Sequence, residues 1–433
     1  MSTPLPPGPA SALPQLLHMS DPFPYMDRLA ARYKSPMTCP LLGQPPMVVV
    51  WDPAQVKQIM GAEPDTFVAS TPDALAAIVG YGSLFLQSGE RHRRSRKLLM
   101  PPFHGERMKS YAELMASAAE RWLQKRTVGS VGPILPVAQG VTLDVIIEAV
   151  FGEDDPTSVH TLHEQILNLV AAFHPLVATF RWMQRDFFGM GPWARLKRAA
   201  RALDQTIAAL MSKKRAHPGA DVLSLLMSAR DETGAPLDDQ EIQEQLLTFV
   251  VAGHETTATS LAWALYELGR APSAMERLRA ELSAASDDPA SLLQIPYLEQ
   301  VICETLRRHP PVPIIPRKLA RPFLLDDFEL PAGQALGLAA YVAQHDPAHF
   351  AEPFSFKPER FSDVNVSPFQ FFPFGGGARR CLGAAFAMYE LKIVLGTWLK
   401  QAHFELDEPG VVGNAFRIGT YGPSTGIRVR RSR

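Results

Sequence analysis

Cysteine is scarce in this sequence. Only three occur among its 433 residues, and Cys39, Cys303 and Cys381 lie far apart. An odd number at such spacing argues against a disulfide framework, and no C-x-x-C pair is present to bind zinc. At least one cysteine is therefore available for other chemistry.

An excess of charge is also lacking. The 43 basic and 44 acidic side chains give a net charge of -1, which offers no overall attraction to nucleic acid or acidic lipid. No window of about 18 uninterrupted apolar residues predicts a membrane-spanning helix. The opening stretch MSTPLPPGPASALPQ has neither the basic start nor the apolar core of a signal peptide. We expect a cytoplasmic protein with no membrane span and no nucleic-acid partner.

The hydrophobic pattern is mainly helical. Residues 54–310 show apolar spacing of the 3.6-residue type, whereas the proline- and glycine-rich stretch 311–380 predicts short strands and turns. The run MVVVWDP at 47–53 predicts a strand, and a last helix follows Cys381. The expected fold class is mainly α with small β-sheets (α+β).

Two predicted helices have clear ends. One opens with Asp238 and Glu241 in capping-box spacing and runs for about thirty residues, or about 45 Å, so it must cross the protein interior. The other begins at Pro296, where a first-turn proline is tolerated, and stops before two further prolines. The whole chain, residues 1–433, is expected to form one domain with a proline-rich segment at about 1–20.

Residues 374–383 read FGGGARRCLG, which places Cys381 after a glycine-rich turn and two arginines. A P-loop is excluded because its lysine and hydroxyl are missing, and a GxGxxG fingerprint would meet Arg380 in place of its third glycine. A helix start and nearby arginines lower the pKa of a thiol, which suits either a nucleophile or a thiolate bound to a metal ion. The residues alone leave both open.

Part of this stretch resembles the haem-binding signature of the cytochrome P450 family. The matching residues are Phe374, Gly375, Gly377, Arg379, Cys381 and Gly383. The resemblance implies haem b, with the sulfur of Cys381 as axial iron ligand and Phe374 shielding it. It also implies that the glycines permit the tight turn and that Arg379 pairs with a haem propionate. Thiolate ligation pushes electron density onto iron and favours O–O cleavage.

A second match lies in the long helix, where Gly253, Glu255 and Thr256 occur in the run AGHETT. The resemblance places the haem between this helix and the cysteine loop. It implies that the glycine loosens the helix, the acid relays protons and the threonine hydroxyl holds dioxygen. Glycine costs a helix interior about 1 kcal/mol relative to alanine. The alternative is a buried helix in which Gly253 permits close packing and Thr256 bonds back to a carbonyl.

A third match is structural. Glu304 and Arg307 are three residues apart and share a helical face, so they can pair. The resemblance adds Arg360 of the run PERF as the third member of a network that braces the cysteine loop. The alternative is an exposed ion pair worth only about 0.2 to 0.5 kcal/mol.

The basic run RHRRSRK at 91–97 could indicate nucleic-acid binding, but no aromatic platform or wider basic field supports it. The resemblance implies that His92, Arg96 and Arg317 pair with haem propionates. The outward-facing members of the run could receive an acidic electron-transfer partner. His345 is expected to be an ordinary histidine.

The resemblance covers roughly residues 50–400 and implies a bacterial-type, monomeric haem-thiolate monooxygenase of secondary metabolism. One oxygen atom from O2 would enter a C–H bond of an apolar small molecule such as a terpenoid, fatty acid or macrocycle, by hydroxylation or also by epoxidation. Electrons would come from NAD(P)H through a separate ferredoxin and ferredoxin reductase, or flavodoxin. The expected substrate pocket is apolar. Its predicted lining is Leu84, Phe85, Phe180, Val251, Ala252, Val312, Ile314, Ile315 and Tyr421.

Three other functions stay open at this point. A haem-thiolate isomerase, dehydratase or peroxide-driven enzyme would keep the haem and often lacks the acid and threonine pair. A non-catalytic haem sensor would need neither Glu255 nor Thr256. A cysteine hydrolase using Cys381 and a histidine would be colourless.

Overall fold

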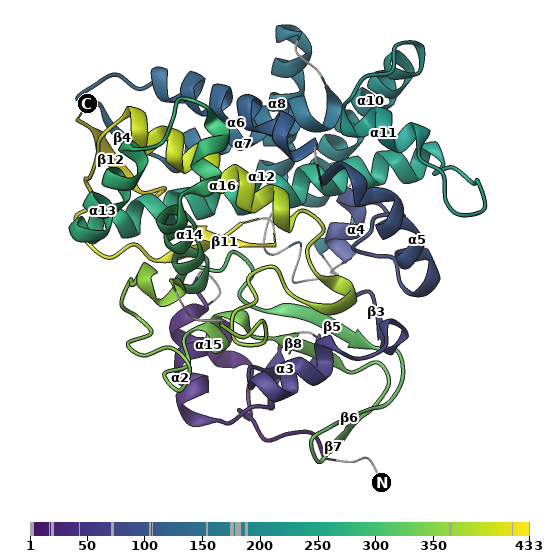
Figure 1. The fold of residues 1–433 in the computed structure, drawn as a ribbon. Helices are drawn as coiled ribbons and strands as arrows, with labels where there is room; N and C mark the ends of the chain where they lie inside the picture. Colours follow the sequence, from purple (N-terminus) through teal and green to yellow (C-terminus); the bar gives the residue numbers. More distant parts are fainter. Residues whose placement is uncertain are drawn as a thin grey trace. The chain divides into compact units, whose positions relative to one another are not determined.

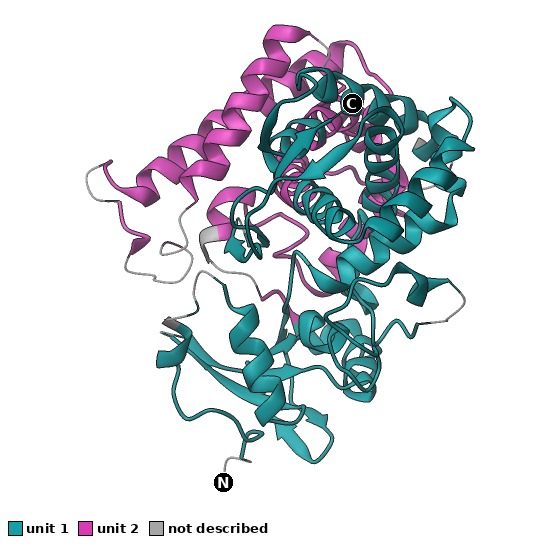
Figure 2. Cartoon of the chain, turned by 90° about the vertical axis from the view of Figure 1, so that its left-hand side faces the viewer, with its two compact units in different colours: residues 1–67, 108–141, 256–433 teal, residues 68–107, 142–255 magenta. Residues whose placement is uncertain are grey.

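The computed structural model describes residues 4–432, except 17, 19–20, 43, 71–72, 104, 106, 153–154, 174–176, 178–182, 187–188, 363–365 and 418. Its chain divides into two compact units, coloured separately in Figure 2. Unit 1 comprises Met1–Phe67, Met108–Val141 and Thr256–Arg433, and unit 2 comprises Val68–Arg107 and Thr142–Glu255. The expectation of one domain stays a prediction.

Helices dominate the structure, and the predicted fold class is confirmed (Figure 1). Unit 1 contains α1 (Leu13–Leu16), α2 (Phe23–Arg32), α3 (Pro53–Met60), α13 (Pro272–Ser283), α14 (Pro296–Arg308), α15 (Ala340–Gln344) and α16 (Ala384–Gln401). Unit 2 contains α4 (Asp73–Val79), α5 (Gly89–Leu99), α8 (Pro156–Ala172), α10 (Pro192–Ala216) and α11 (Val222–Ser228). The helices with residues in both units are α6 (Arg107–Gln124), α7 (Leu135–Ile146) and α12 (Asp239–Arg270).

The strands are short and form small sheets. They are β1 (Met37–Leu41), β2 (Gln44–Val50), β3 (Phe67–Val68), β4 (Val131–Pro133), β5 (Ile315–Leu319), β6 (Phe323–Leu325), β7 (Phe328–Leu330), β8 (Ala335–Leu338), β9 (Phe404–Leu406), β10 (Asn414–Phe416), β11 (Tyr421–Pro423) and β12 (Arg428–Arg431). The largest sheet has the order β1-β2-β8-β5-β3; its β2 and β8 are parallel, and Val48 lies opposite Leu336. The strand predicted at 47–53 is therefore confirmed as part of β2, which ends at Val50.

The core of unit 1 gathers on this sheet. Val48, Leu336 and Leu338 are fully buried, and the cluster around them includes Phe23 of α2 and Val56 of α3. Burial of a large apolar side chain stabilises the folded state by about 1.5 to 3 kcal/mol. The sheet and the helices packed on it therefore give β5 and the end of α3 fixed positions.

The predicted start of α12 and both predicted ends of α14 are present in the structure. The Asp238 carboxylate accepts from the Glu241 N–H at 2.7 Å, and Glu241 reaches back to the Asp238 N–H at 3.4 Å, so the capping box of α12 is formed. Helix α14 begins at Pro296 and ends at Arg308, before the two prolines. None of the described helices is alone long and apolar enough to cross a membrane. One bent pair, Leu135–Phe151 with Pro156–Ala172, passes that test by length and composition only.

Candidate functional site

Cys381 closes a tight turn in unit 1. Its N–H donates to the Phe374 carbonyl at 2.9 Å, and the Gly375 N–H donates to the Phe372 carbonyl at 2.9 Å. Gly375 and Gly377 have φ values of 65° and 63°, a left-handed backbone that glycine adopts without penalty. Cys381 is exposed and belongs to no disulfide. The turn thus presents a thiol at the surface of unit 1.

The end of helix α3 supports this turn from behind. A Cβ added to Gly376 would lie 2.2 Å from the Met60 sulfur, and one added to Gly377 would lie 2.2 Å from the Met60 carbonyl oxygen. Gly377 is therefore required by close approach of the α3 backbone, whereas Gly376 packs against the Met60 side chain. Gly383 lies directly before α16, where an added Cβ would meet open space.

Arg317 on β5 is a buried cation that is only partly satisfied. Its Nη1 donates to the Pro316 carbonyl at 2.9 Å, whereas Nη2 is buried with no hydrogen-bond partner among the described residues. Burial, and secondly the charge of Arg379, lower the pKa of Arg317 to about 10. Two neighbouring cations, one of them buried, favour binding of an anion. A propionate of the expected haem would supply that anion, so the residues of this region fit the cofactor.

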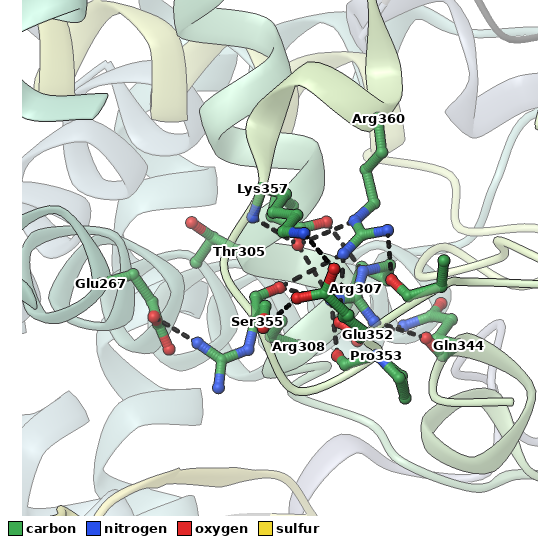
Figure 3. A network of polar contacts seen from close by, with 12 residues as sticks. Glu267, Thr305, Arg307, Arg308, Gln344, Glu352, Pro353, Ser355, Lys357 and Arg360 are labelled. Atoms are coloured by element: carbon green, nitrogen blue, oxygen red, sulfur yellow. Dashed lines mark hydrogen bonds and ion pairs between the residues drawn. The ribbon is translucent and has the colours of Figure 1, made fainter. Parts of the chain in front are cut away.

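The predicted Glu304, Arg307 and Arg360 network is formed in unit 1, as Figure 3 shows for its arginines. Arg307 Nε lies 2.7 Å from Glu304 Oε2, and Arg360 Nε lies 3.1 Å from Glu304 Oε1. The Arg307 and Glu304 side chains are both 0% exposed. The alternative of an exposed ion pair is therefore wrong.

The network reaches the cysteine turn through Gln344, which the sequence analysis did not identify. Arg307 Nη1 donates to the Gln344 carbonyl at 2.7 Å, and the Gln344 side chain accepts from the Phe372 N–H at 3.3 Å. The Phe372 carbonyl in turn accepts from Gly375. A chain of hydrogen bonds thus joins α14 to the residues that hold Cys381.

Within unit 2, the segment of α12 before the unit boundary packs against α7. A Cβ added to Gly253 would lie 2.9 Å from Ile146 Cδ1, so the close packing proposed as the alternative role of Gly253 is present. Glu255 is 2% exposed, and its Oε2 lies 3.8 Å from His254 Nε2. The Thr142 hydroxyl lies 3.2 Å from the His254 carbonyl and 2.9 Å from His254 Nδ1. The Thr142 hydroxyl has a single proton, which it donates to the His254 carbonyl. The bond to His254 Nδ1 therefore runs the other way, with Nδ1–H as donor and the Thr142 oxygen as acceptor.

Past the boundary, in unit 1, hydroxyl groups support the same helix. The Thr256 carbonyl accepts from Thr259 Oγ1 at 3.0 Å and from Ser260 Oγ at 2.8 Å. Bonds of this kind bend helices, which suits the poor helix formers of this stretch. Thr257 bonds to Glu390 of α16, whose burial raises its pKa well above the ordinary value. Glu390 is thus a buried acid on α16, and an acidic residue inside the apolar run after Cys381 was its signal in the sequence.

Burial also gives His254 a pH-dependent effect on stability. Burial, with a smaller contribution from His163, lowers the pKa of His254 to about 4, whereas an unfolded histidine titrates near 6.5. The unfolded chain therefore binds more protons between these values, and stability falls as the pH drops from about 6.5 toward 4. From pH 7 to 5 this histidine alone should cost about 2 kcal/mol of unfolding free energy.

Urea unfolding of the native chain and of His254→Gln at both pH values measures this effect. The amide can keep a bond to Thr142 but does not titrate, so the variant should lose less stability on acidification. Equal losses in the two proteins would show that His254 does not carry the effect.

His92 and Arg96 lie one turn apart on α5 in unit 2, so they share a face of that helix. The other cations of the run are paired: Arg91 with Glu241, Arg94 with Asp231 and Glu241, Arg93 with Glu90, and Lys97 with Glu232. The run therefore does not present a field of unbalanced positive charge. Docking of an acidic electron-transfer partner on this run stays a prediction.

The predicted pocket residues fall in several places. In unit 2, Leu84 is buried, Phe85 is 39% exposed, and Val251 and Ala252 are half-buried on α12. In unit 1, Val312, Ile314, Ile315 and Tyr421 are half-buried. The Tyr421 N–H donates to the Pro311 carbonyl at 2.9 Å, which brings β11 to the residues before β5. Phe180 lies outside the described residues. His345 bonds through Nδ1 to the Tyr341 carbonyl at 2.8 Å.

Comparison with known proteins identifies the family. Residues 4–416 match the family model described as cytochrome P450. A Mycobacterium tuberculosis protein named as a cytochrome P450 137 is 36% identical over 416 residues, which cover 94% of this chain and 84% of that protein. Another, named as a cytochrome P450 138, is 33% identical over 395 residues, covering 90% of this chain and 86% of that protein.

Solved structures agree. The retinoic acid bound cyanobacterial CYP120A1 superposes with a TM-score of 0.86 at 26% identity and covers 99% of both chains. The cytochrome P450DA heme domain has the same TM-score at 22% identity, covering 100% of this chain and 98% of that chain, and so shows the fold. The chain belongs to the cytochrome P450 family, the haem-thiolate monooxygenases that act on small molecules with O2 and electrons from redox partners.

Proposed function

We propose that this protein inserts one oxygen atom from O2 into a C–H bond of an apolar small molecule, by hydroxylation or by epoxidation of an alkene. The reaction consumes two electrons and two protons and releases one water. The observation that carries the proposal is the pair Glu255 and Thr256 beside Gly253 on α12, in a chain that also presents Cys381 on a glycine turn. An isomerase, dehydratase or sensor would not need that pair.

Haem b is the proposed cofactor, and when bound it supplies the activation of O2. The Cys381 sulfur would hold the iron, Phe374 would shield that sulfur, and Gly375, Gly377 and Gly383 would permit the tight turn of the backbone. Four side chains would hold the propionates. They are Arg317, Arg379, His92 and Arg96, of which Arg317 has the clearest need for an anion.

Two residues of α12 would hold and move protons. Glu255 is buried, and a buried acid tends to keep its proton or a charged partner. The Thr256 hydroxyl can both accept and donate, so it can take a proton from an acid or water and pass it to oxygen. Well-placed proton transfer is worth about 10² to 10⁴ in rate. Glu304, Arg307 and Arg360 would act only by bracing the turn.

The substrate is proposed to be a terpenoid, fatty acid or macrocycle bound by the predicted pocket residues. Retinoic acid, which is bound in the cyanobacterial structure, is an isoprenoid of mainly apolar surface, and this supports the terpenoid class. An apolar ligand that buries about 300 Å² gains roughly 7 kcal/mol before the costs of association. Electrons would come from NAD(P)H through a ferredoxin and its reductase, or a flavodoxin.

Titration of the haem-loaded protein with an apolar compound library tests the proposal. Compounds that shift the ferric Soret band are then incubated with NADH, a ferredoxin and its reductase, and separately with peroxide alone. We expect oxygenated product that contains one atom from ¹⁸O2 in the first mixture. Product that forms only in the peroxide mixture would contradict the proposal. Absence of product in both mixtures, for every compound that binds, would contradict it as well.

Replacing Thr256 by alanine should separate electron consumption from product formation. We expect product per NADH to fall about tenfold or more, with haem content and ligand-induced Soret shifts retained. Thr256→Ser keeps a hydroxyl and should keep most of the coupling. Coupling that survives in the alanine variant would show that Thr256 does not handle the protons.

A further inference from the structure

A loop of unit 2 is tied to the first turns of α12 by polar side chains. This loop, residues 80–88, joins α4 to α5 and is named the 80–88 loop below. On α12 its partners are Glu244, Gln245 and Thr248, one helical turn in extent. None of these contacts was visible in the sequence, because the partners lie more than 160 positions apart.

Gln245 makes the central contact and is 0% exposed. Its Oε1 accepts from the Leu84 N–H at 3.0 Å, and its Nε2 donates to the Gly82 carbonyl at 2.6 Å. One side-chain amide thus forms hydrogen bonds with two backbone groups of the loop, two residues apart, as a neighbouring strand would. A buried amide deprived of partners costs more than the bonds contribute, so the loop and Gln245 hold each other in place.

The loop sequence GYGSLFLQS fits this contact. A Cβ on Gly80, whose φ is 76°, would lie 2.3 Å from the Glu244 carboxyl carbon, and one on Gly82 would lie 2.1 Å from Glu244 Oε2. The left-handed φ of Gly80 favours glycine there, whereas at Gly82 an added methyl group would have to displace the end of the Glu244 side chain. The Gly82 N–H donates to that carboxylate. Ser83 is 0% exposed, and its Oγ lies 2.7 Å from Thr248 Oγ1.

The loop backbone held in this way includes Leu84, a predicted substrate contact, and leads directly to Phe85, another such contact. Leu84 donates its N–H to Gln245, and Phe85 follows it. Gln245 lies ten positions before Glu255 on one helix, or about 15 Å along its axis. One helix thus carries both the loop attachment and Glu255, which is one of the proposed proton-handling residues.

We propose that Gln245 is a positioning residue that holds the 80–88 loop on α12 and thereby sets which sizes of apolar substrate bind well. This inference rests on the proposed function, since it assumes that Leu84 and Phe85 contact substrate. Gln245 itself acts through the loop backbone. Loss of its two bonds lets the loop move outward, so large ligands are penalised less and small ligands are enclosed less tightly.

Gln245→Met is the main test, because methionine has a similar length and apolar volume but cannot make the two bonds. Gln243→Met is the matched control, since Gln243 is half-buried on the same helix and makes no hydrogen bond to the 80–88 loop among the described residues. In the haem-loaded protein, hydrogen exchange of the 80–88 peptide should be about tenfold faster in Gln245→Met and unchanged in the control. Gly82→Ala, which places a methyl group against Glu244, should accelerate the same exchange from the loop side.

Dissociation constants from Soret titrations with a small and a large apolar compound supply the second readout. The ratio of the small-ligand to the large-ligand constant should rise about fivefold or more in Gln245→Met and Gly82→Ala. Unchanged exchange in Gln245→Met would overturn the attachment, and faster exchange with an unchanged ratio would overturn the role in selectivity. Failure of the proposed function gives a different result, because the native protein would then form no oxygenated product. The hydrogen-exchange rates and the ratio of the dissociation constants would still measure how firmly the 80–88 loop is held.

Discussion

Cys381→Ser should abolish the strongly red-displaced absorption maximum that the haem-supplied, reduced native protein is expected to give under carbon monoxide. The physical reason is the donor atom: thiolate sulfur pushes electron density onto iron, and a serine oxygen does so far less. Oxygenation of any substrate should fall by three orders of magnitude or more, roughly the scale of losing an essential catalytic group. Absorption spectra of the purified proteins provide the measurement.

Cys39→Ser is the matched control for this change. Cys39 is half-buried on β1, and its Sγ accepts from Gln15 Nε2 at 3.3 Å. Its substitution should leave the displaced maximum intact. A displaced maximum that persists in Cys381→Ser, or that is absent from the native protein, would refute the assignment of Cys381 as the iron ligand.

Glu304→Ala should be the most destabilising substitution in the braced region. Removing the carboxylate leaves Arg307 fully buried with its charge uncompensated, and also removes partners of Arg360 and of the Lys357 N–H. Breaking a buried pair in this way costs about 3 to 5 kcal/mol. We expect a lower unfolding midpoint and faster haem loss, because the Gln344 link to Phe372 is weakened with it.

Glu299→Ala offers a control on the same helix. Glu299 is 54% exposed and pairs with Lys392, so its loss should cost less than about 1 kcal/mol. Unfolding in guanidinium and the rate of haem transfer to apomyoglobin measure the two effects. If the two variants lost similar stability, the buried network would not have the bracing role.

The sequence could predict those features of the structure that depend on residues close together in the chain. The start of α12 follows from a capping box and the two ends of α14 follow from prolines, which act within a few residues. The turn before Cys381 follows from glycines whose φ values are positive. The pairing of Glu304 with Arg307 follows from helical spacing, and only its full burial needed the fold.

Contacts between distant segments were not predictable. Met60 supports Gly377, Gln344 connects Arg307 to Phe372, and Gln245 holds Gly82, in each case across a separation that no periodicity encodes. The ion pairs of the basic run at 91–97 were not predictable for the same reason. Its acidic neighbours Asp231, Glu232 and Glu241 arrive from a part of the chain about 140 positions later.

The burial of Arg307 also constrains the order in which unit 1 can assemble. Its guanidinium donates to the carbonyls of Gln344 and Pro353, which are synthesised after α14 is complete. Until those carbonyls dock, water must solvate the cation, since dehydration without partners costs several kcal/mol. A nascent chain that stops short of residue 344 therefore keeps this face of α14 hydrated, and Gln344 can join Arg307 to Phe372 only after residue 372 has been synthesised.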